Sequence, residues 1–109
     1  MEIKETGYLK VMGDYSFPEK RIVINPNDGF DLGLMMTEAT VLFYYGESPA
    51  TIERSTASPL YGVVEQKNEC KLGTVEVSLK ALEKLGSPER IRLHLIPQER
   101  YPKLLVAAE

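Results

Sequence analysis

The fold is decided by residues 74–95, TVEVSLKALEKLGSPERIRLHL. Residues 74–77 and 90–95 alternate apolar with polar side chains, which predicts two strands with one buried face each. Residues 78–86 between them carry leucines three apart, a spacing that places them on one face of a helix. The stretch therefore predicts a strand–helix–strand arm.

Both ends of the predicted helix have recognisable signals. Ser78 is a suitable N-cap, because its hydroxyl can accept a hydrogen bond from an unpaired N–H of the first turn. Gly86 suits the position after the last turn, where a positive φ is needed, and Pro88 prevents the helix from continuing. We expect Leu82 to be buried, together with Leu79 and Leu85 on the same face.

A fainter copy of this arm precedes it in the chain, with a strand at 21–24, a connection at 25–33 and a strand at 40–45. A constant shift in numbering pairs Ile22 with Val75, Ile24 with Val77, Leu32 with Leu85 and Gly33 with Gly86; after a gap, Val41, Phe43 and Tyr45 pair with Ile91, Leu93 and Leu95. We therefore expect one domain, residues 1–109, with pseudo-repeated arms at about 20–46 and 73–97.

The rest of the chain also favours β structure. Further strands are predicted at 8–12, 61–66 and 103–107, with a turn at Phe17-Pro18-Glu19. Residues 25–29, NPNDG, have the composition of a turn, and residues 46–59 form a long irregular loop. The predicted fold class is mainly β, a small barrel with one or two short helices.

The composition of the chain indicates its cellular compartment and the kinds of partner to expect. Cys70 is the one cysteine among 109 residues, so no disulfide forms within the chain, and the free thiol fits the cytoplasm. No apolar run has the length needed to cross a bilayer, so we expect no membrane partner. Residues 1–50 hold four basic and eight acidic side chains, whereas residues 51–109 hold nine and eight. A basic surface is therefore expected only in the second half.

Residues 73–95 resemble one arm of an AbrB/SpoVT-type swapped-hairpin domain. The resemblance rests on Gly73, Val75, Val77, the helix through Leu82, Leu85 and Gly86, and the strand 90–95. The chain departs from that family at Ser78, where a proline is common, and at Ser87-Pro88-Glu89, where a Gly-Asp turn is usual. Two arms in one chain look more like the related double-psi barrels, and both groups are cradle-loop barrels. The resemblance implies a cradle-loop-type barrel.

The candidate binding residues are cations of the second half. Arg90, Arg92 and His94 alternate along one strand and therefore share a face, which Arg100 and Lys103 can extend. Such a face can bind nucleic-acid phosphates. The alternative is the ordinary solvated face of a half-buried strand, with Glu89 and Glu99 as neighbours.

No constellation of residues indicates catalysis, a metal site or a cofactor. Cys70 lies next to Lys71, but a nucleophilic thiol also needs an oriented base, and His94 is the one histidine of the chain. An unreactive cysteine is the plainer interpretation.

These observations favour a non-enzymatic binding module. The AbrB-like resemblance implies a DNA-binding regulator, for which a homodimer is one option. The double-psi resemblance implies a protein-interaction or adaptor domain, so the expected partner is nucleic acid or another protein. A small cofactor-binding subunit is a third option.

Overall fold

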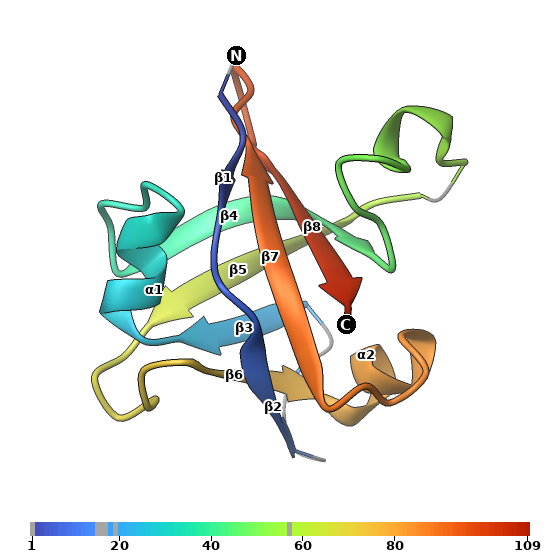
Figure 1. Ribbon diagram of the computed structural model, residues 1–109. Coiled ribbons are helices and arrows are strands. Elements are labelled where there is room, and N and C mark those ends of the chain that lie inside the picture. The colour runs from blue at the N-terminus through green and yellow to red at the C-terminus, as the bar shows by residue number, and fades with distance from the viewer. Residues whose placement is uncertain (1, 15–17, 19, 57) are drawn as a thin grey trace.

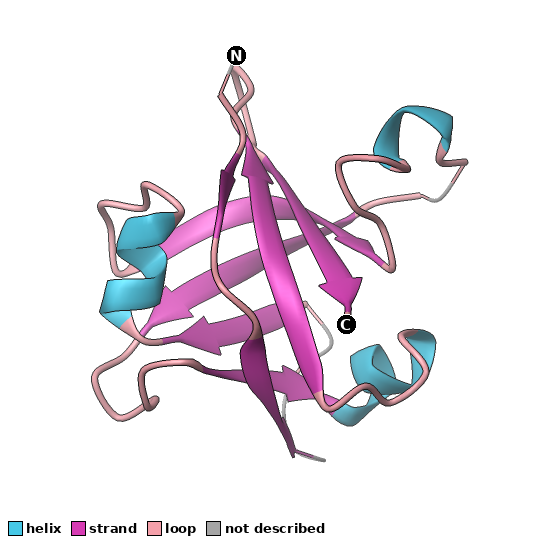
Figure 2. Cartoon of the chain, in the orientation of Figure 1, coloured by secondary structure: helices cyan, strands magenta, loops and turns pink. Residues whose placement is uncertain are grey.

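The computed structural model describes residues 2–14, 18, 20–56 and 58–109. It shows a mainly β protein with two short α-helices, as expected (Figures 1 and 2). Residues 17 and 19 of the predicted turn lie outside the described residues. The strands are β1 (Lys4–Glu5), β2 (Leu9–Asp14), β3 (Arg21–Ile24), β4 (Glu38–Tyr45), β5 (Leu60–Gln66), β6 (Thr74–Ser78), β7 (Arg90–Ile96) and β8 (Lys103–Ala108).

The helices are α1 (Pro26–Asp31), α2 (Leu79–Lys84) and a 3-10 turn, η1 (Ile52–Arg54), inside the predicted loop. The expected turn at 25–29 is therefore wrong, because most of it is helix α1. The Asn25 side chain accepts a hydrogen bond from the Asn27 N–H at 2.9 Å, and Pro26 occupies the first turn. The residues that suggested a turn instead cap and start a helix.

The strands close into a seven-stranded barrel. Its circuit runs β2–β6–β3–β5–β4–β8–β7 and returns to β2. β1 and β2 pair with β7 one after the other along its length, since Lys4 pairs with Leu95 and Leu9 pairs with Ile91. Three pairs are parallel: β2 with β6, β3 with β5, and β4 with β8. Helices α1 and α2 lie on opposite sides of the barrel (Figure 1).

No helix in the described part of the chain has the length and apolarity to span a membrane.

The two predicted arms, β3–α1–β4 and β6–α2–β7, correspond in strand register. Val23 of the first arm pairs with Glu76 of the second arm, and these two residues occupy equivalent positions of the repeat. The repeat also reaches further than expected, because β2 and β5 correspond as well. Val11 lies beside Val75 in one half, and Val64 lies beside Ile22 in the other.

The arms also correspond around their helices. Asn25 and Ser78 both have extended backbone before a helix of six residues, with φ of −72° and −71°. Gly33 and Gly86 follow the helices with φ of +74° and +80°, so each supplies the left-handed conformation that favours glycine. The register and the helix ends of the two arms thus agree with the repeat that the sequence predicts.

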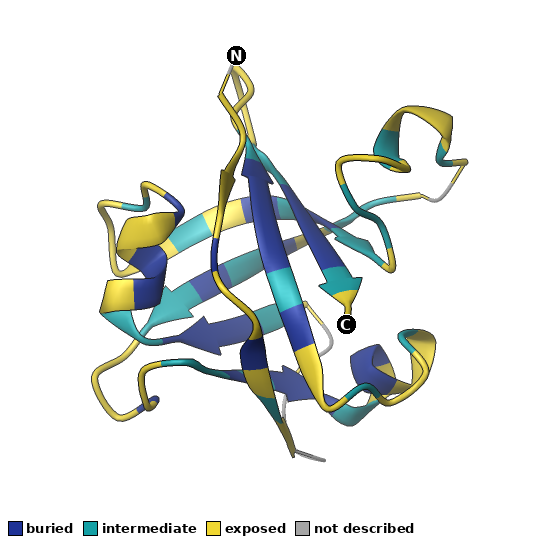
Figure 3. Cartoon of the chain, in the orientation of Figure 1, coloured by how far each residue is buried: buried dark blue, intermediate teal, exposed yellow. Residues whose placement is uncertain are grey.

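Alternate residues of the strands fill the barrel. The largest fully buried side chain is Phe43, and the leucines and β-branched residues of both halves pack around it. Buried apolar positions recur at intervals of two along β4 and β7, and in β7 His94 is buried as well (Figure 3). This is the alternation that the sequence predicts.

β2 extends past its expected end at Met12 because Gly13 and Asp14 continue the pairing with β6. A Cβ atom at Gly13 would lie 2.7 Å from Leu79 and 2.8 Å from Leu82. Gly13 therefore does not end the strand. Its missing side chain makes room for the apolar face of α2.

Leu82→Ala is expected to lower the free energy of unfolding by about 2–5 kcal/mol, the range for truncating a core leucine. Leu82 is 8% exposed and belongs to the core cluster. Urea denaturation measures the change. The control is Glu83→Ala on the exposed face of α2, which should stay within about 0.5 kcal/mol of the parent protein. A loss below about 1 kcal/mol for Leu82→Ala would show that this face of α2 is not core.

Candidate functional site

The most exposed apolar side chains gather where α1 leads into β4. Phe30 is 76% exposed, Met35 89% and Met36 71%. We call these three residues the α1 patch. Large apolar side chains that lie together at the surface often mark an interaction site, whereas single ones are ordinary.

The second arm shows that the fold does not need this patch. The position of Phe30 in α1 corresponds to Glu83 in α2, and both side chains are exposed. The connection after Gly33 is Leu34-Met35-Met36-Thr37, whereas Ser87-Pro88-Glu89 follows Gly86. The same supersecondary unit thus forms with charged and polar residues at its tip. The apolar residues of the first arm need another explanation.

The backbone beneath the α1 patch is held firmly. The Gln66 side-chain amide donates hydrogen bonds to the carbonyls of Met36 at 2.7 Å and Leu34 at 3.4 Å. A Cβ atom at Gly29 would lie 2.1 Å from the Gln66 Oε1 atom, so any larger residue there would displace the Gln66 side chain from this position. The methionine side chains therefore project from an anchored loop, and less ordering is needed when a partner binds.

Acidic residues border the α1 patch. Asp31 ends α1, Glu38 begins β4, and both are exposed. Neither makes an ion pair with any residue that the structure describes. Glu38 also lies opposite Glu65 in the β4–β5 pairing, but Arg21 at 2.5 Å and Lys67 at 3.5 Å neutralise Glu65. The uncompensated charge near the patch is thus negative.

Asp28 has a structural role on the inner side of α1. Its carboxylate accepts a hydrogen bond from the Gly73 N–H at 2.9 Å, which ties α1 to the turn before β6. Burial raises the pKa of Asp28, and the neighbouring Asp31 adds to the increase, whereas the Gly73 N–H lowers it.

Arg90 and Arg92 of the predicted basic face both lie on β7, and both have ion-pair partners. Arg90 lies 3.4 Å from the Glu109 carboxylate. Arg92 forms an ion pair with Glu5, donates to the Thr6 carbonyl at 2.9 Å and lies over the Tyr8 ring. Arg92 therefore holds the N-terminal segment against β7.

His94 shares this face but is only 7% exposed. Burial lowers the pKa of His94, the positive charge of Arg92 lowers it further, and Glu5 opposes both. The imidazole is therefore neutral at pH 7. The expectation of a solvated side chain is corrected here, because His94 is covered at its place between β1 and β8.

The two outlying cations differ in setting. Arg100 is exposed after β7, and Lys103 lies over the Tyr44 ring, 5.6 Å from its centroid. Lys10, which the sequence did not single out, stands opposite Arg90 in the β2–β7 pairing. Lys10 and Arg90 line an open hollow of about 650 Å³, together with Val11 and Glu89.

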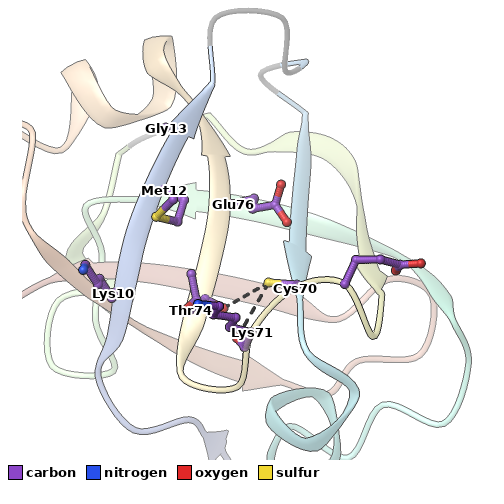
Figure 4. Close-up of a pocket in the computed structure, with 8 residues that line it drawn as sticks. Lys10, Met12, Gly13, Cys70, Lys71, Thr74 and Glu76 are labelled. Carbon is purple, nitrogen blue, oxygen red and sulfur yellow. Dashed lines mark hydrogen bonds between the residues drawn. The ribbon is translucent and has the colours of Figure 1, made fainter.

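Cys70 lies in a second open pocket, of about 470 Å³ (Figure 4). The side chain is 2% exposed, and its thiol donates to the carbonyls of Thr74 at 3.4 Å and Val23 at 3.6 Å. Burial raises the pKa of Cys70 to about 11, and the carboxylates of Glu76 and Asp28 add to the increase. None of its hydrogen bonds within the described structure involves His94. The geometry is that of a protonated, unreactive thiol.

The Cys70 thiol is expected to make stability fall at alkaline pH. Its pKa rises from 9.0 to about 11 on folding, so the unfolded chain loses the proton first. Stability from this group is therefore complete below pH 9 and decreases by about 2 kcal/mol as the pH rises toward 11. Urea denaturation of the parent protein and of Cys70→Ala across this range isolates the effect. Equal pH dependence in both proteins would contradict it.

The residues that the structure describes contain no group of three or more His, Cys, Asp or Glu placed to hold a metal ion. Comparisons of the chain with models of protein families, with curated proteins and with solved structures found no match. Of the surfaces described above, the α1 patch is the one that combines high exposure, an anchored backbone and uncompensated charge.

Proposed function

We propose that the protein is a non-enzymatic protein-interaction module that binds its partner through the α1 patch. The observation that carries the proposal is the contrast between the arms, since Phe30 is 76% exposed where the equivalent residue is Glu83. The second arm folds with a charged residue at its tip. We infer that folding does not require the apolar residues at the tip of the first arm either.

The barrel architecture supports the same function. Each of the two arms packs within its own chain, as in the double-psi barrels that the sequence resembles, and β3 pairs with β6 of the same molecule. That arrangement is less like the swapped hairpins of AbrB-type DNA-binding dimers. Adaptor and protein-interaction domains are common among double-psi barrels, and this resemblance fits the role proposed here.

Site-specific photo-cross-linking tests the proposal. A benzophenone amino acid is introduced at position 30 and, in a matched control, at position 83 on the equivalent arm. Irradiation of cells that produce the protein should join position 30, but not position 83, to a defined protein. The adduct should re-form with that protein in purified form. Equal labelling at both positions, or adducts of position 30 with nucleic acid alone, would contradict the proposal.

A nucleic-acid-binding regulator is the second candidate, favoured by the hollow between Lys10 and Arg90. In this case the site comprises Lys10 and Arg90 at the hollow, with Arg92, Arg100 and Lys103 as further cations, whereas the buried His94 is not part of it. Binding of labelled DNA or RNA, measured by anisotropy, should then weaken with salt and with Arg92→Glu for all sequences, because phosphate contacts displace counterions. The interaction of Arg92 with Glu5 makes a stability control of this variant necessary. Absence of binding at low salt would remove this candidate.

A further inference from the structure

We propose that the partner of the α1 patch presents a cationic amphipathic segment, with an apolar row flanked by Lys or Arg. This inference rests on the proposed function and specifies the chemistry of its partner. Charge complementarity at the rim of the patch carries it.

The rim of the α1 patch, formed by Asp31 and Glu38, is negatively charged. Asp31 directly follows Phe30, Glu38 begins β4 two residues after Met36, and both are exposed with no ion-pair partner among the described residues. Lys4 is a cation close to the same connection, since its aliphatic stem would lie 3.0 Å from a Cβ atom at Gly33. The two carboxylates outnumber this ammonium group. A partner with positive charges beside its apolar row gains from both acids, whereas an acidic partner is repelled.

The centre of the patch favours side-chain contacts with an irregular apolar surface. Methionine side chains are flexible and polarizable, so Met35 and Met36 can adapt to the shape of a partner, while Phe30 supplies a rigid aromatic anchor. β4 pairs with β5 from Glu38 to Phe43, and β8 pairs with the second half of β4 from Leu42 to Tyr45. The binding mode inferred here uses the exposed side chains of the α1 patch.

The same charges disfavour two other occupants. In a two-fold contact with a second copy, the same patch meets itself, so the acidic rims would face each other. A membrane surface with anionic lipids would also repel Asp31 and Glu38. A cationic segment of another protein is the occupant that the rim favours.

Two fluorescent amphipathic peptides test the inference, one of leucine and lysine and one of leucine and glutamate. The lysine peptide should bind at least about 10-fold more tightly, and its affinity should fall with salt. Asp31→Lys/Glu38→Lys should reverse the preference. Phe30→Gln, which leaves the charge unchanged, should remove binding of the lysine peptide, whereas Glu83→Lys on the other arm should not.

Three outcomes would overturn the inference. The first is equal or tighter binding of the glutamate peptide, and the second is lysine-peptide binding that Phe30→Gln leaves intact. The third is occupation of the patch by a second copy or by lipid, seen as Phe30-dependent self-association in sedimentation or as Phe30-dependent binding to vesicles. If photo-cross-linking at position 30 still yields a protein adduct, the proposed function stands and only the charge of the partner is wrong.

Discussion

Phe30→Gln is expected to weaken binding of the cross-linked partner by about 30-fold or more, the effect of losing an interface hot spot of about 2 kcal/mol. The Phe30 ring is the largest side chain of the α1 patch and is 76% exposed in the free protein. Glutamine has a higher helix propensity than phenylalanine, so α1 should keep its structure.

The control for this prediction is Glu83→Gln, which places the same side chain at the corresponding position of α2. Titration calorimetry with the purified partner should give an unchanged affinity for this control. A loss below about 3-fold for Phe30→Gln would place the binding surface elsewhere.

Phe43→Ala is expected to lower the free energy of unfolding by about 3–5 kcal/mol, the largest stability effect that we anticipate. Phe43 is 1% exposed, stacks on Tyr45 with ring centroids 5.6 Å apart, and covers Gly62. A Cβ atom at Gly62 would lie 2.2 Å from the Phe43 ring, so the ring fills the space that the glycine leaves. Truncation would open a cavity at the centre of the barrel.

The control for Phe43 comes from the pseudo-symmetry. Leu93 is buried at the corresponding position of the second arm, so Phe43→Leu introduces the apolar side chain that the other arm has there. We expect a clearly smaller loss for Phe43→Leu than for Phe43→Ala in urea denaturation. Equal losses would show that the filled volume at this position does not determine stability.

The barrel was predictable because its arms are built from local signals. Alternating apolar residues mark β7, and a serine cap, leucines three apart and Gly86 mark α2. The constant shift between the arms then identified the weaker copy. Helix α1 was missed because Asn, Pro, Asp and Gly favour a turn on their own, and the Asn25 cap becomes visible only in the structure.

The closure of the barrel depends on long-range pairing that the sequence does not encode locally. The parallel pairs β2–β6 and β3–β5 join strands far apart in the chain, and their correspondence was not visible from apolar spacing alone. Gly29 belongs to the stretch predicted as a turn, but in the structure it admits the Gln66 side chain. Gly13 lies just beyond the predicted end of the first strand, but it continues β2 and admits the leucines of α2.

The candidate site, like the fold, could be predicted from the sequence only in part. The alternation of Arg90, Arg92 and His94 correctly predicts a shared face, but ion pairing and burial depend on β1, β8 and the C-terminal residue, which the pattern does not include. The α1 patch was missed because Phe30, Met35 and Met36 have no unusual spacing. A comparison of the two arms position by position is the signal that finds Phe30, since its counterpart is Glu83.

The most direct test of the account is the free energy of unfolding of Phe30→Gln/Met35→Gln/Met36→Gln. The central claim is that these three side chains serve binding and that the barrel does not need them. Exposed substitutions usually change stability by less than about 0.5 kcal/mol, so urea denaturation of this variant should give a value within that margin of the parent protein. A loss of about 2 kcal/mol or more would show that the α1 patch is part of the folded core, and would contradict the account.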